Sequence, residues 1–388
     1  MRVLLVACDY PPTQSPRALR WRYLTRELAL LGHEVHVLVP DLGEPNVELP
    51  QTPGRVVVHR TFPGPFGWLI GRAGRRRERP ANSPVHPATE SGTRLNWRGR
   101  LMDIAKRIAG LALFPDVRAE WNPWARHALR RLLPALPGCG RRCRDVVVTS
   151  HEPASTLLLG AYAQRHGFAW VADLGDPVCA AYTPERWRRR AMALEARVST
   201  LADYVLVTNE ATRALLIQRH GQDARRCAVL PNGYDDRRIP AEHLWDRPSF
   251  DDKRLELVYA GRLYGYRDPA PLLQAVATTP GVRLTLVVPD PPEGDASATL
   301  MEGAGDRLRP LGPLPHDQVQ AMLERADVLV NFGDRGQPVR IAAKVYEYLG
   351  IARPILHVHS GEGDAAAALL RGLGRGWLCA ADAGELAA

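Results

Sequence analysis

The run from Tyr259 to Arg267 has the clearest arrangement of residues for binding a phosphorylated ligand. Gly261 directly follows an apolar segment typical of a buried strand, and Arg262 and Arg267 come next, five positions apart. A glycine lets an anion approach the backbone, and guanidinium groups match phosphate oxygens bidentately. The run therefore predicts a diphosphate site, with a solvated turn bearing two surface arginines as the alternative.

A second pair of charged residues lies further along the same half. Lys344 and Glu347 are three positions apart, which places them on one face of a helix predicted over 341–350. A carboxylate near a helix start can accept two ribose hydroxyls, and a lysine there can reach phosphate. The alternative is an intrahelical ion pair, worth on the order of a few tenths of a kcal/mol.

In the first half of the chain, polar residues follow two predicted strands, over 145–150 and 168–173. His151, Asp173 and Asp176 are the candidates for catalytic contacts there, with Glu152 beside them. Polar residues on loops at strand ends are often functional. His151 could equally be a residue that caps the helix predicted to start at 154.

The loop after the first strand contributes an acceptor-side candidate. Thr13, Gln14 and Ser15 precede a helix in which Ser15 is a plausible N-cap and Pro16 fits the first turn. Backbone amides and hydroxyls at such a helix start can bind an oxyanion.

These residues would be positioned by an alternation of strands and helices. The pattern predicts an α/β fold with two doubly wound Rossmann-like domains that face each other across a cleft. We expect an N-terminal domain over 1–234, a linker over 235–252 and a C-terminal domain over 253–388, with a mobile basic excursion at about 64–110. The predicted strands cover 2–8, 33–40, 145–150, 168–173, 203–208, 228–232, 255–261, 282–289, 327–332 and 353–358, and the predicted helices cover 16–31, 154–166, 185–201, 269–278, 316–325 and 341–350.

The composition of the chain limits the kinds of partner that it can have. The chain has 388 residues and a formal net charge of +9, from 51 Lys+Arg against 42 Asp+Glu, which indicates an anionic partner. Six cysteines spread over a long chain without a signal-peptide pattern favour a reducing cytoplasm, and their spacing predicts no metal site. No apolar run approaches the ~20 residues of a membrane-spanning helix.

The basic excursion suggests two kinds of acceptor. Its arginines, Arg72 to Arg79 among them, flank the apolar segments 66–70 and 104–114, a pattern that can rest on an anionic membrane. We expect either a lipid-linked acceptor at such a surface, or a disordered arginine-rich loop on an enzyme for a small-molecule natural product. The arginines lack interleaved aromatic positions, so nucleic acid is not expected as a partner.

Taken together, the motifs resemble retaining family-4 glycosyltransferases of the GT-B fold. The resemblance covers almost the whole chain. It is closest to the branch that builds capsular and exopolysaccharide sugars. The motifs that carry it are the Gly-Arg pair at 261–262 with Arg267, the run from Lys344 to Pro354, the turn at 230–234, the segment 31–35, the segment 113–116 with Trp121, and the segment 170–177. By this resemblance the N-terminal domain over 1–234 would be the acceptor-binding domain and the C-terminal domain over 253–388 the donor-nucleotide domain. Arg262 and Arg267 would clamp the donor diphosphate, and Glu347 would hold the ribose.

The sequence departs from the family pattern at three places. The glutamate usual eight positions before Glu347 is Val339, so Asp334 is a possible substitute for a contact with the donor sugar. Where the branch has Asp-x-Arg-Asp, this chain has Gly175 between Asp173 and Asp176. The Gly-Gly turn that often follows the first strand is replaced by 13–15.

The resemblance implies a hexosyltransferase-type enzyme for polysaccharide or natural-product biosynthesis. The donor would be a UDP, GDP or dTDP sugar, and the enzyme would need no cofactor and no metal. We expect it in the cytoplasm, either free or in peripheral contact with the cytoplasmic face of a membrane. Two alternatives use the same diphosphate site. One is a catalytically degenerate GT-B partner subunit, suggested by Val339 and Gly175. The other is a sugar-nucleotide epimerase, which would need paired carboxylates and a histidine around one sugar carbon.

Overall fold

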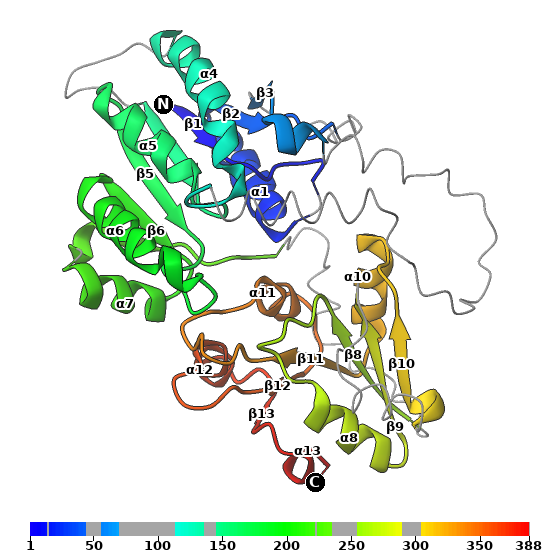
Figure 1. Cartoon of the computed structure of the whole chain (residues 1–388). Coiled ribbons are helices and arrows are strands. Elements are labelled where there is room, and N and C mark those ends of the chain that lie inside the picture. The colour runs from blue at the N-terminus through cyan, green and yellow to red at the C-terminus, as the bar shows by residue number, and fades with distance from the viewer. Residues whose placement is uncertain are drawn as a thin grey trace, which may run out of the picture. The chain divides into compact units, whose positions relative to one another are not determined.

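The computed structural model describes residues 1–13, 15–43, 56–69, 113–135, 145–221, 223–234, 254–288 and 304–387. These residues form two compact units (Figure 1). The first contains Met1–Thr208 and Leu216–Leu230, and the second contains Asn209–Leu215 and Pro231–Ala388. The expected linker over 235–252, Gln14 and the arginines of the basic excursion lie outside the described residues.

The first unit is built on a parallel sheet of seven strands in the order β3-β2-β1-β4-β5-β6-β7. Its strands are β1 (Arg2–Val6), β2 (Glu34–Pro40), β3 (Val56–Thr61), β4 (Val146–Ser150), β5 (Ala169–Leu174), β6 (Tyr204–Val207) and β7 (Cys227–Val229). Its connections contain α1 (Pro16–Leu30), η1 (Val117–Trp121), α4 (Asn122–Ala135), α5 (Thr156–Arg165), α6 (Glu185–Leu201), α7 (Glu210–His220) and η2 (Ala224–Arg226). The part of α7 up to Leu215 is counted with the second unit.

Both faces of this sheet are covered, and strand β1 shows why. Its alternate side chains point to opposite faces. Val3 and Leu5 pack with Trp21 of α1 in one core cluster. Leu4 and Val6 pack with residues of α4 and α5 in another. A strand buried on both faces must be apolar throughout, and β1 is apolar from its second residue onward.

The second unit repeats the arrangement with a six-stranded parallel sheet in the order β10-β9-β8-β11-β12-β13. Leu257 and Tyr259 of β8 pack with α8 on one face, and Val258 packs with α10, α11 and α12 on the other. The strands are β8 (Leu255–Ala260), β9 (Val282–Val287), β10 (Leu308–Leu311), β11 (Val328–Phe332), β12 (Ile355–Val358) and β13 (Trp377–Cys379). The helices are α8 (Ala270–Thr278), η5 (Gly305–Arg307), α10 (His316–Arg325), α11 (Ala343–Leu349), α12 (Ala365–Gly372) and α13 (Ala383–Ala387).

The predicted fold class, two doubly wound α/β domains, is confirmed by these sheets. In each sheet the strand order reverses between its first strand and its fourth, at β1/β4 and at β8/β11. Ligands of such sheets bind beyond the carboxyl ends of the strands at this switch point. Strands β3, β10 and β13 and helices α4, α7, α12 and α13 were not predicted.

Within the described ranges, the longest apolar helices are too short or too polar to cross a bilayer.

Candidate active site

In the first unit, the loops after β4 and β5 bring two predicted residues together. Ser150 pairs with Asp173 in the sheet, and the His151 amide donates a hydrogen bond to the Asp173 carbonyl at 2.8 Å. The Asp173 side chain is fully buried. A buried carboxylate is costly unless cations or hydrogen bonds compensate it.

Two arginines from the start of α1 provide that compensation. Arg17 and Arg20 are three positions apart, so they share a helix face. Arg20 Nη2 donates to Asp173 Oδ1 at 3.0 Å, and Arg17 Nη1 lies 3.7 Å from Asp173 Oδ2. Both arginine side chains are largely buried, at 13% and 4% exposure. The helix is held in place for this contact by Ser15, whose hydroxyl accepts a hydrogen bond from the Ala18 amide at 3.0 Å.

The Arg17 guanidinium occupies the space beside Gly175. A Cβ atom at position 175 would lie 0.8 Å from Arg17 Nη2, so any side chain there would overlap the guanidinium. Position 175 is where the resemblance led us to expect an arginine. A guanidinium is therefore present beside Asp173, but it comes from α1.

Arg17 also contacts the loop after β4. Its Nε donates to Glu152 Oε2 at 3.3 Å. The negative charges of Glu152, Asp173 and Asp176 raise the pKa of Arg17 against the opposing effect of burial. Glu152 has φ 70°, the left-handed region that non-glycine residues rarely adopt and that is common at functional sites.

His151 is buried beside this cluster. Burial lowers the pKa of His151 to about 4, mainly because the low-dielectric interior disfavours the charged imidazolium. Its Nδ1 atom is buried and has no hydrogen-bond partner within the described chain. Asp176 is also buried.

Of the acceptor-side candidates, Thr13 and Ser15 are described and Gln14 is not. The Thr13 amide closes a turn by donating to the Tyr10 carbonyl at 3.2 Å. The Ser15 hydroxyl caps α1 and donates to Asp9 Oδ2 at 2.9 Å. The Ser15 hydroxyl is therefore already engaged in two hydrogen bonds within the protein, one as donor and one as acceptor.

In the second unit, Gly261 follows β8 at the switch point and has φ 121°. A Cβ atom at this position would lie 2.7 Å from the Lys344 ammonium, so glycine permits the close approach of Lys344. Lys344 Nζ lies 3.6 Å from the centroid of the Tyr259 ring, a cation–π distance. The ammonium is buried and has no hydrogen-bond partner among the described residues. Burial and the nearby Arg267 charge lower the pKa of Lys344 well below its usual range.

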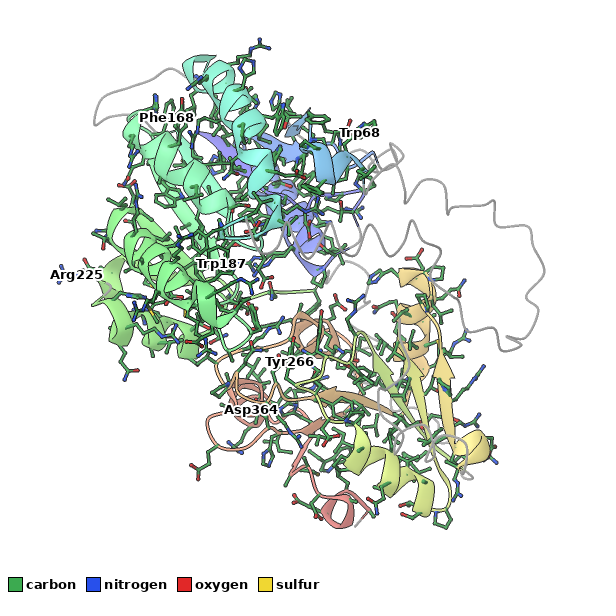
Figure 2. The ribbon with its side chains drawn as sticks, in the orientation of Figure 1. Trp68, Phe168, Trp187, Arg225, Tyr266 and Asp364 are labelled. Carbon is green, nitrogen blue, oxygen red and sulfur yellow. The ribbon has the colours of Figure 1, made fainter. Side chains whose placement is uncertain are left out.

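Arg267 has a different environment from the one expected of a diphosphate clamp. It is buried and its Nε donates to Asp334 Oδ1 at 2.5 Å, while its Nη1 donates to the Arg262 carbonyl at 3.2 Å. Arg340 Nη1 reaches Asp334 Oδ2 at 3.3 Å and the hydroxyl of Tyr266, labelled in Figure 2, at 2.8 Å. Asp334 is thus held between two arginines.

Arg262 and Glu347 remain accessible. Arg262 is exposed, and its carbonyl, fixed by Arg267 and by the Tyr259 hydroxyl at 2.9 Å, anchors the loop that presents it. Glu347 is half-buried, and burial raises the pKa of its carboxyl. Among the described residues Lys344 Nζ has no hydrogen-bond partner, so its charge attracts that of Glu347 without a hydrogen bond between them.

Sequence reasoning missed Arg17 and Arg20. The sequence feature that could have indicated them is their spacing: two arginines three positions apart in the helix after the first strand, on the helix face that also carries Trp21. Within the described residues, no group of three or more His, Cys, Asp or Glu side chains is placed to hold a metal ion.

Comparisons with known proteins identify the family and the fold. The family model of the glycosyl transferase 4-like domain matches residues 18–233. No curated protein sequence matches the chain. A sucrose-phosphate synthase from Thermosynechococcus elongatus has a similar structure, with a TM-score of 0.62 at 16% identity over 100% of this chain and 88% of that one.

Two further solved structures are similar. One is an alpha,alpha-trehalose-phosphate synthase (UDP-forming) from Burkholderia vietnamiensis, with a TM-score of 0.58 at 14% identity over 100% of this chain and 90% of that one. The other is an Arabidopsis thaliana protein complexed with UDP-L-rhamnose, with a TM-score of 0.52 at 14% identity over 100% and 88%.

The two sheets and these likenesses define a protein of the GT-B glycosyltransferase fold. The chain belongs to the glycosyl transferase 4-like family.

The contact between Arg17 and Gly175 yields a first prediction. Gly175→Ala should destabilise the first unit by roughly 1–3 kcal/mol, because the added methyl group overlaps the guanidinium. In an Arg17→Ala background the same change should cost much less, since the space is then empty. A double-mutant cycle on urea unfolding measures this coupling. Gly167→Ala is the control: no atom outside its own neighbours lies within 4 Å of that position, so its cost should be additive with Arg17→Ala. Additivity of Gly175→Ala as well would contradict the prediction.

His151 yields a second prediction. Between the unfolded value of 6.5 and the folded pKa of about 4, the unfolded chain binds the extra proton. The free energy of unfolding should therefore decrease as the pH falls through this window, by up to about 3 kcal/mol from this group. Unfolding of wild type and His151→Gln at several pH values tests it: the stability difference should shrink toward low pH. His127→Gln, at an exposed position on α4, is the control. A pH-independent difference for His151→Gln would contradict the prediction.

Proposed function

We propose that this protein transfers a sugar from a nucleotide-diphosphate sugar to an acceptor. The observation that carries the proposal is the buried Lys344 ammonium without a hydrogen-bond partner beside Gly261. An uncompensated buried cation is unfavourable by itself. A diphosphate at this switch point would supply the missing negative charge and favour the charged form of Lys344.

The diphosphate contacts that we propose differ in part from those expected from the sequence. Lys344 and the exposed Arg262 would contact the phosphate oxygens, and Gly261 would leave room for them. Arg267 is already neutralised by Asp334 and fixes the Arg262 carbonyl, so we assign Arg267 and Asp334 to positioning the loop. This makes Asp334 a poor substitute for the missing glutamate at Val339.

We further propose that Glu347 accepts the ribose hydroxyls. Its carboxyl is half-buried on the same helix as Lys344, α11. The similar Burkholderia vietnamiensis synthase is described as UDP-forming, and the similar Arabidopsis thaliana protein was solved with UDP-L-rhamnose. These two similar structures favour UDP-sugars as the first donors to test, ahead of GDP and dTDP sugars.

On the first unit we propose that His151 and Asp176 contact the reacting sugar or the acceptor hydroxyl. Asp173 is fully buried and held by two arginines, so we assign it to positioning. A neutral His151 can exchange a proton or hydrogen bond without carrying charge at neutral pH. The acceptor is a lipid-linked glycan or a small natural product.

We propose transfer with retention of configuration, as the family resemblance implies. A front-face route requires no enzymic nucleophile: the bond from the anomeric carbon to the diphosphate oxygen breaks, the acceptor oxygen bonds to that carbon on the same face, and the acceptor proton passes to the leaving phosphate. The protein then contributes positioning and stabilisation of charge on the leaving group. Lys344 and Arg262 would provide that stabilisation.

Lys344→Met gives a test with two opposite readouts. Removing the uncompensated ammonium should raise the thermal stability of the ligand-free protein, by roughly 1–3 kcal/mol. The same change should weaken binding of UDP by roughly 10- to 100-fold, because a charge-assisted contact is lost. Thermal shift with UDP, GDP and dTDP measures both effects, since a bound ligand stabilises according to its concentration over its dissociation constant.

Arg371→Met on α12 is the matched control, because it removes a positive charge from an exposed site of the same unit. It should leave nucleotide binding unchanged. Absence of a shift with every nucleotide in the wild type would refute the proposed function. Incubation with donor sugars then separates the alternatives: slow donor hydrolysis indicates a transferase, inversion at the sugar C2 an epimerase, and binding without turnover a partner subunit.

A further inference from the structure

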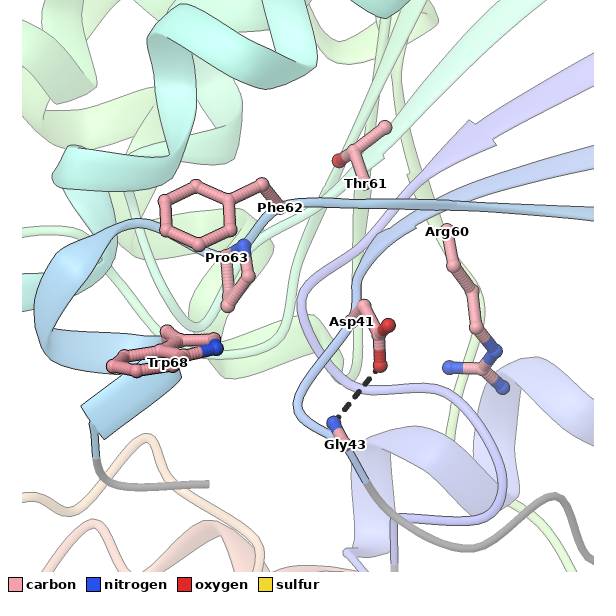
Figure 3. Close-up of a pocket in the computed structure, with 7 residues that line it drawn as sticks. All are labelled: Asp41, Gly43, Arg60, Thr61, Phe62, Pro63 and Trp68. Atoms are coloured by element: carbon pink, nitrogen blue, oxygen red, sulfur yellow. Dashed lines mark hydrogen bonds between the residues drawn. The ribbon is translucent and has the colours of Figure 1, made fainter. Parts of the chain in front are cut away.

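A hollow of about 340 Å³ lies at the carboxyl ends of β2 and β3 in the first unit. None of the predicted catalytic, donor-binding or acceptor-side residues lines it, although Trp68 belongs to the apolar segment 66–70. Its walls are formed by Asp41, Gly43, Arg60, Thr61, Phe62, Pro63 and Trp68 (Figure 3). The volume falls in the range of small-ligand pockets, about 300–1,000 Å³. The carboxyl end of a parallel strand is also where ligands of α/β sheets bind.

The two sides of the hollow differ in chemistry. Figure 3 shows Phe62, Pro63 and Trp68 on one side and Asp41 and Arg60 on the other. The residues Phe62 and Trp68 are 41% and 43% exposed, which is high for large aromatic residues. An apolar wall opposite a charged wall suits a ligand with an apolar face and a polar edge.

The charged wall keeps hydrogen-bonding capacity. Asp41 accepts a hydrogen bond from the Gly43 amide at 2.9 Å through Oδ1, and Arg60 donates from Nη2 to the Pro11 carbonyl at 2.8 Å. In the part of the chain that the structure describes, neither side chain forms an ion pair. These bonds fix each side chain in position and leave a carboxylate oxygen and guanidinium N–H groups for a ligand.

The walls are also held rigidly. The Asp41 amide donates to the Thr61 carbonyl at 2.7 Å, so the ladder of β2 and β3 continues to the edge of the hollow. The helical turn over 65–69 that carries Trp68 is fixed by Glu120, whose oxygens accept from the Phe66 and Gly67 amides at 3.0 and 2.6 Å. Gly64, with φ 98°, allows Glu120 this approach. Rigid walls reduce the entropy lost on binding.

We propose that this hollow binds a pyranose ring of the acceptor. A sugar ring presents C–H groups on its face, which can lie on the indole of Trp68, and hydroxyls on its edge, which can donate to Asp41 and accept from Arg60. One carboxylate and one guanidinium compensate each other in net charge, so the site favours an uncharged saccharide over a sugar phosphate. The inference rests on the proposed function, for which it names the acceptor class.

The test uses ¹⁹F NMR of the full chain labelled with 5-fluorotryptophan. The chain has nine tryptophans, and the Trp68 resonance is assigned as the one that disappears in Trp68→Phe. A panel of methyl glycopyranosides is titrated without donor. We expect at least one neutral glycoside to shift the Trp68 resonance in a saturable manner and to leave Trp377, an exposed tryptophan on β13, unchanged.

Asp41→Asn should weaken that binding by about tenfold or more, because a neutral amide replaces a charged acceptor. An intact fluorotryptophan spectrum elsewhere shows that the variant is folded. Trp68→Phe keeps an aromatic wall, so calorimetry should still detect binding of the glycoside to this variant. Trp68→Ala removes the wall and should abolish that binding.

Four results would overturn the inference. They are no response to any glycoside, a response to glucose 6-phosphate as strong as that to methyl glucoside, an equal response to an indole without hydroxyls, or a response only to anionic vesicles. The readout needs no nucleotide. A chain that binds UDP but no glycoside loses only this inference, whereas a chain that binds glycosides but no nucleotide loses the proposed function and keeps the saccharide pocket.

Discussion

A single carboxylate without access to water governs the arrangement of the first unit. Asp173 lies at the end of β5 and is fully buried, so its charge must be matched inside the protein. Arg17 and Arg20 match it, and Arg20 also donates to the Leu230 carbonyl at 2.9 Å after β7. The start of α1 is thereby tied to the ends of two strands that are distant from it in sequence. Arg17 extends the link to Glu152, whose left-handed backbone conformation would be unfavourable without such contacts.

In the second unit, buried charges are also compensated by opposite charges, with one exception. Arg267 and Asp334 are buried together and neutralise each other, with Arg340 as a second donor. Within the described residues, Lys344 Nζ has no hydrogen-bond partner and lies over the face of the Tyr259 ring, close to Gly261. A cation–π contact is worth about 0.5–2 kcal/mol, which is less than the cost of burying an unpaired ammonium. Natural sequences retain such unfavourable groups mainly where a ligand completes them. On this contrast between the two cations we base the proposal that Arg267 positions the loop and Lys344 binds the ligand.

Most of the fold could be predicted from the sequence, because strands buried on both faces are continuous apolar runs and are easily distinguished from amphipathic helices. Helices α6 and α10 begin and end at the predicted residues. Strand β3 was missed because it lies at the edge of the sheet and none of its residues is fully buried. The site was predicted only where residues lie near each other in sequence. Gly175 indicated a lost arginine, and no local pattern could show that Arg17, more than 150 residues earlier, supplies the guanidinium.

The charges around Asp173 also bear on the kind of acceptor group that can approach. Glu152, Asp173 and Asp176 contribute three negative charges, Arg17 and Arg20 contribute two positive ones, and His151 is neutral above about pH 4. The formal charges of these six residues alone sum to 2 − 3 = −1 at neutral pH. Their carboxylates can accept a hydrogen bond from a hydroxyl group. The hollow beside Asp41 and Arg60 is neutral in sum, so neither polar region described in the first unit selects for an anionic acceptor group. If the acceptor is lipid-linked, as proposed above, we infer that its phosphate would bind away from both regions, while its sugar hydroxyl would approach the carboxylates.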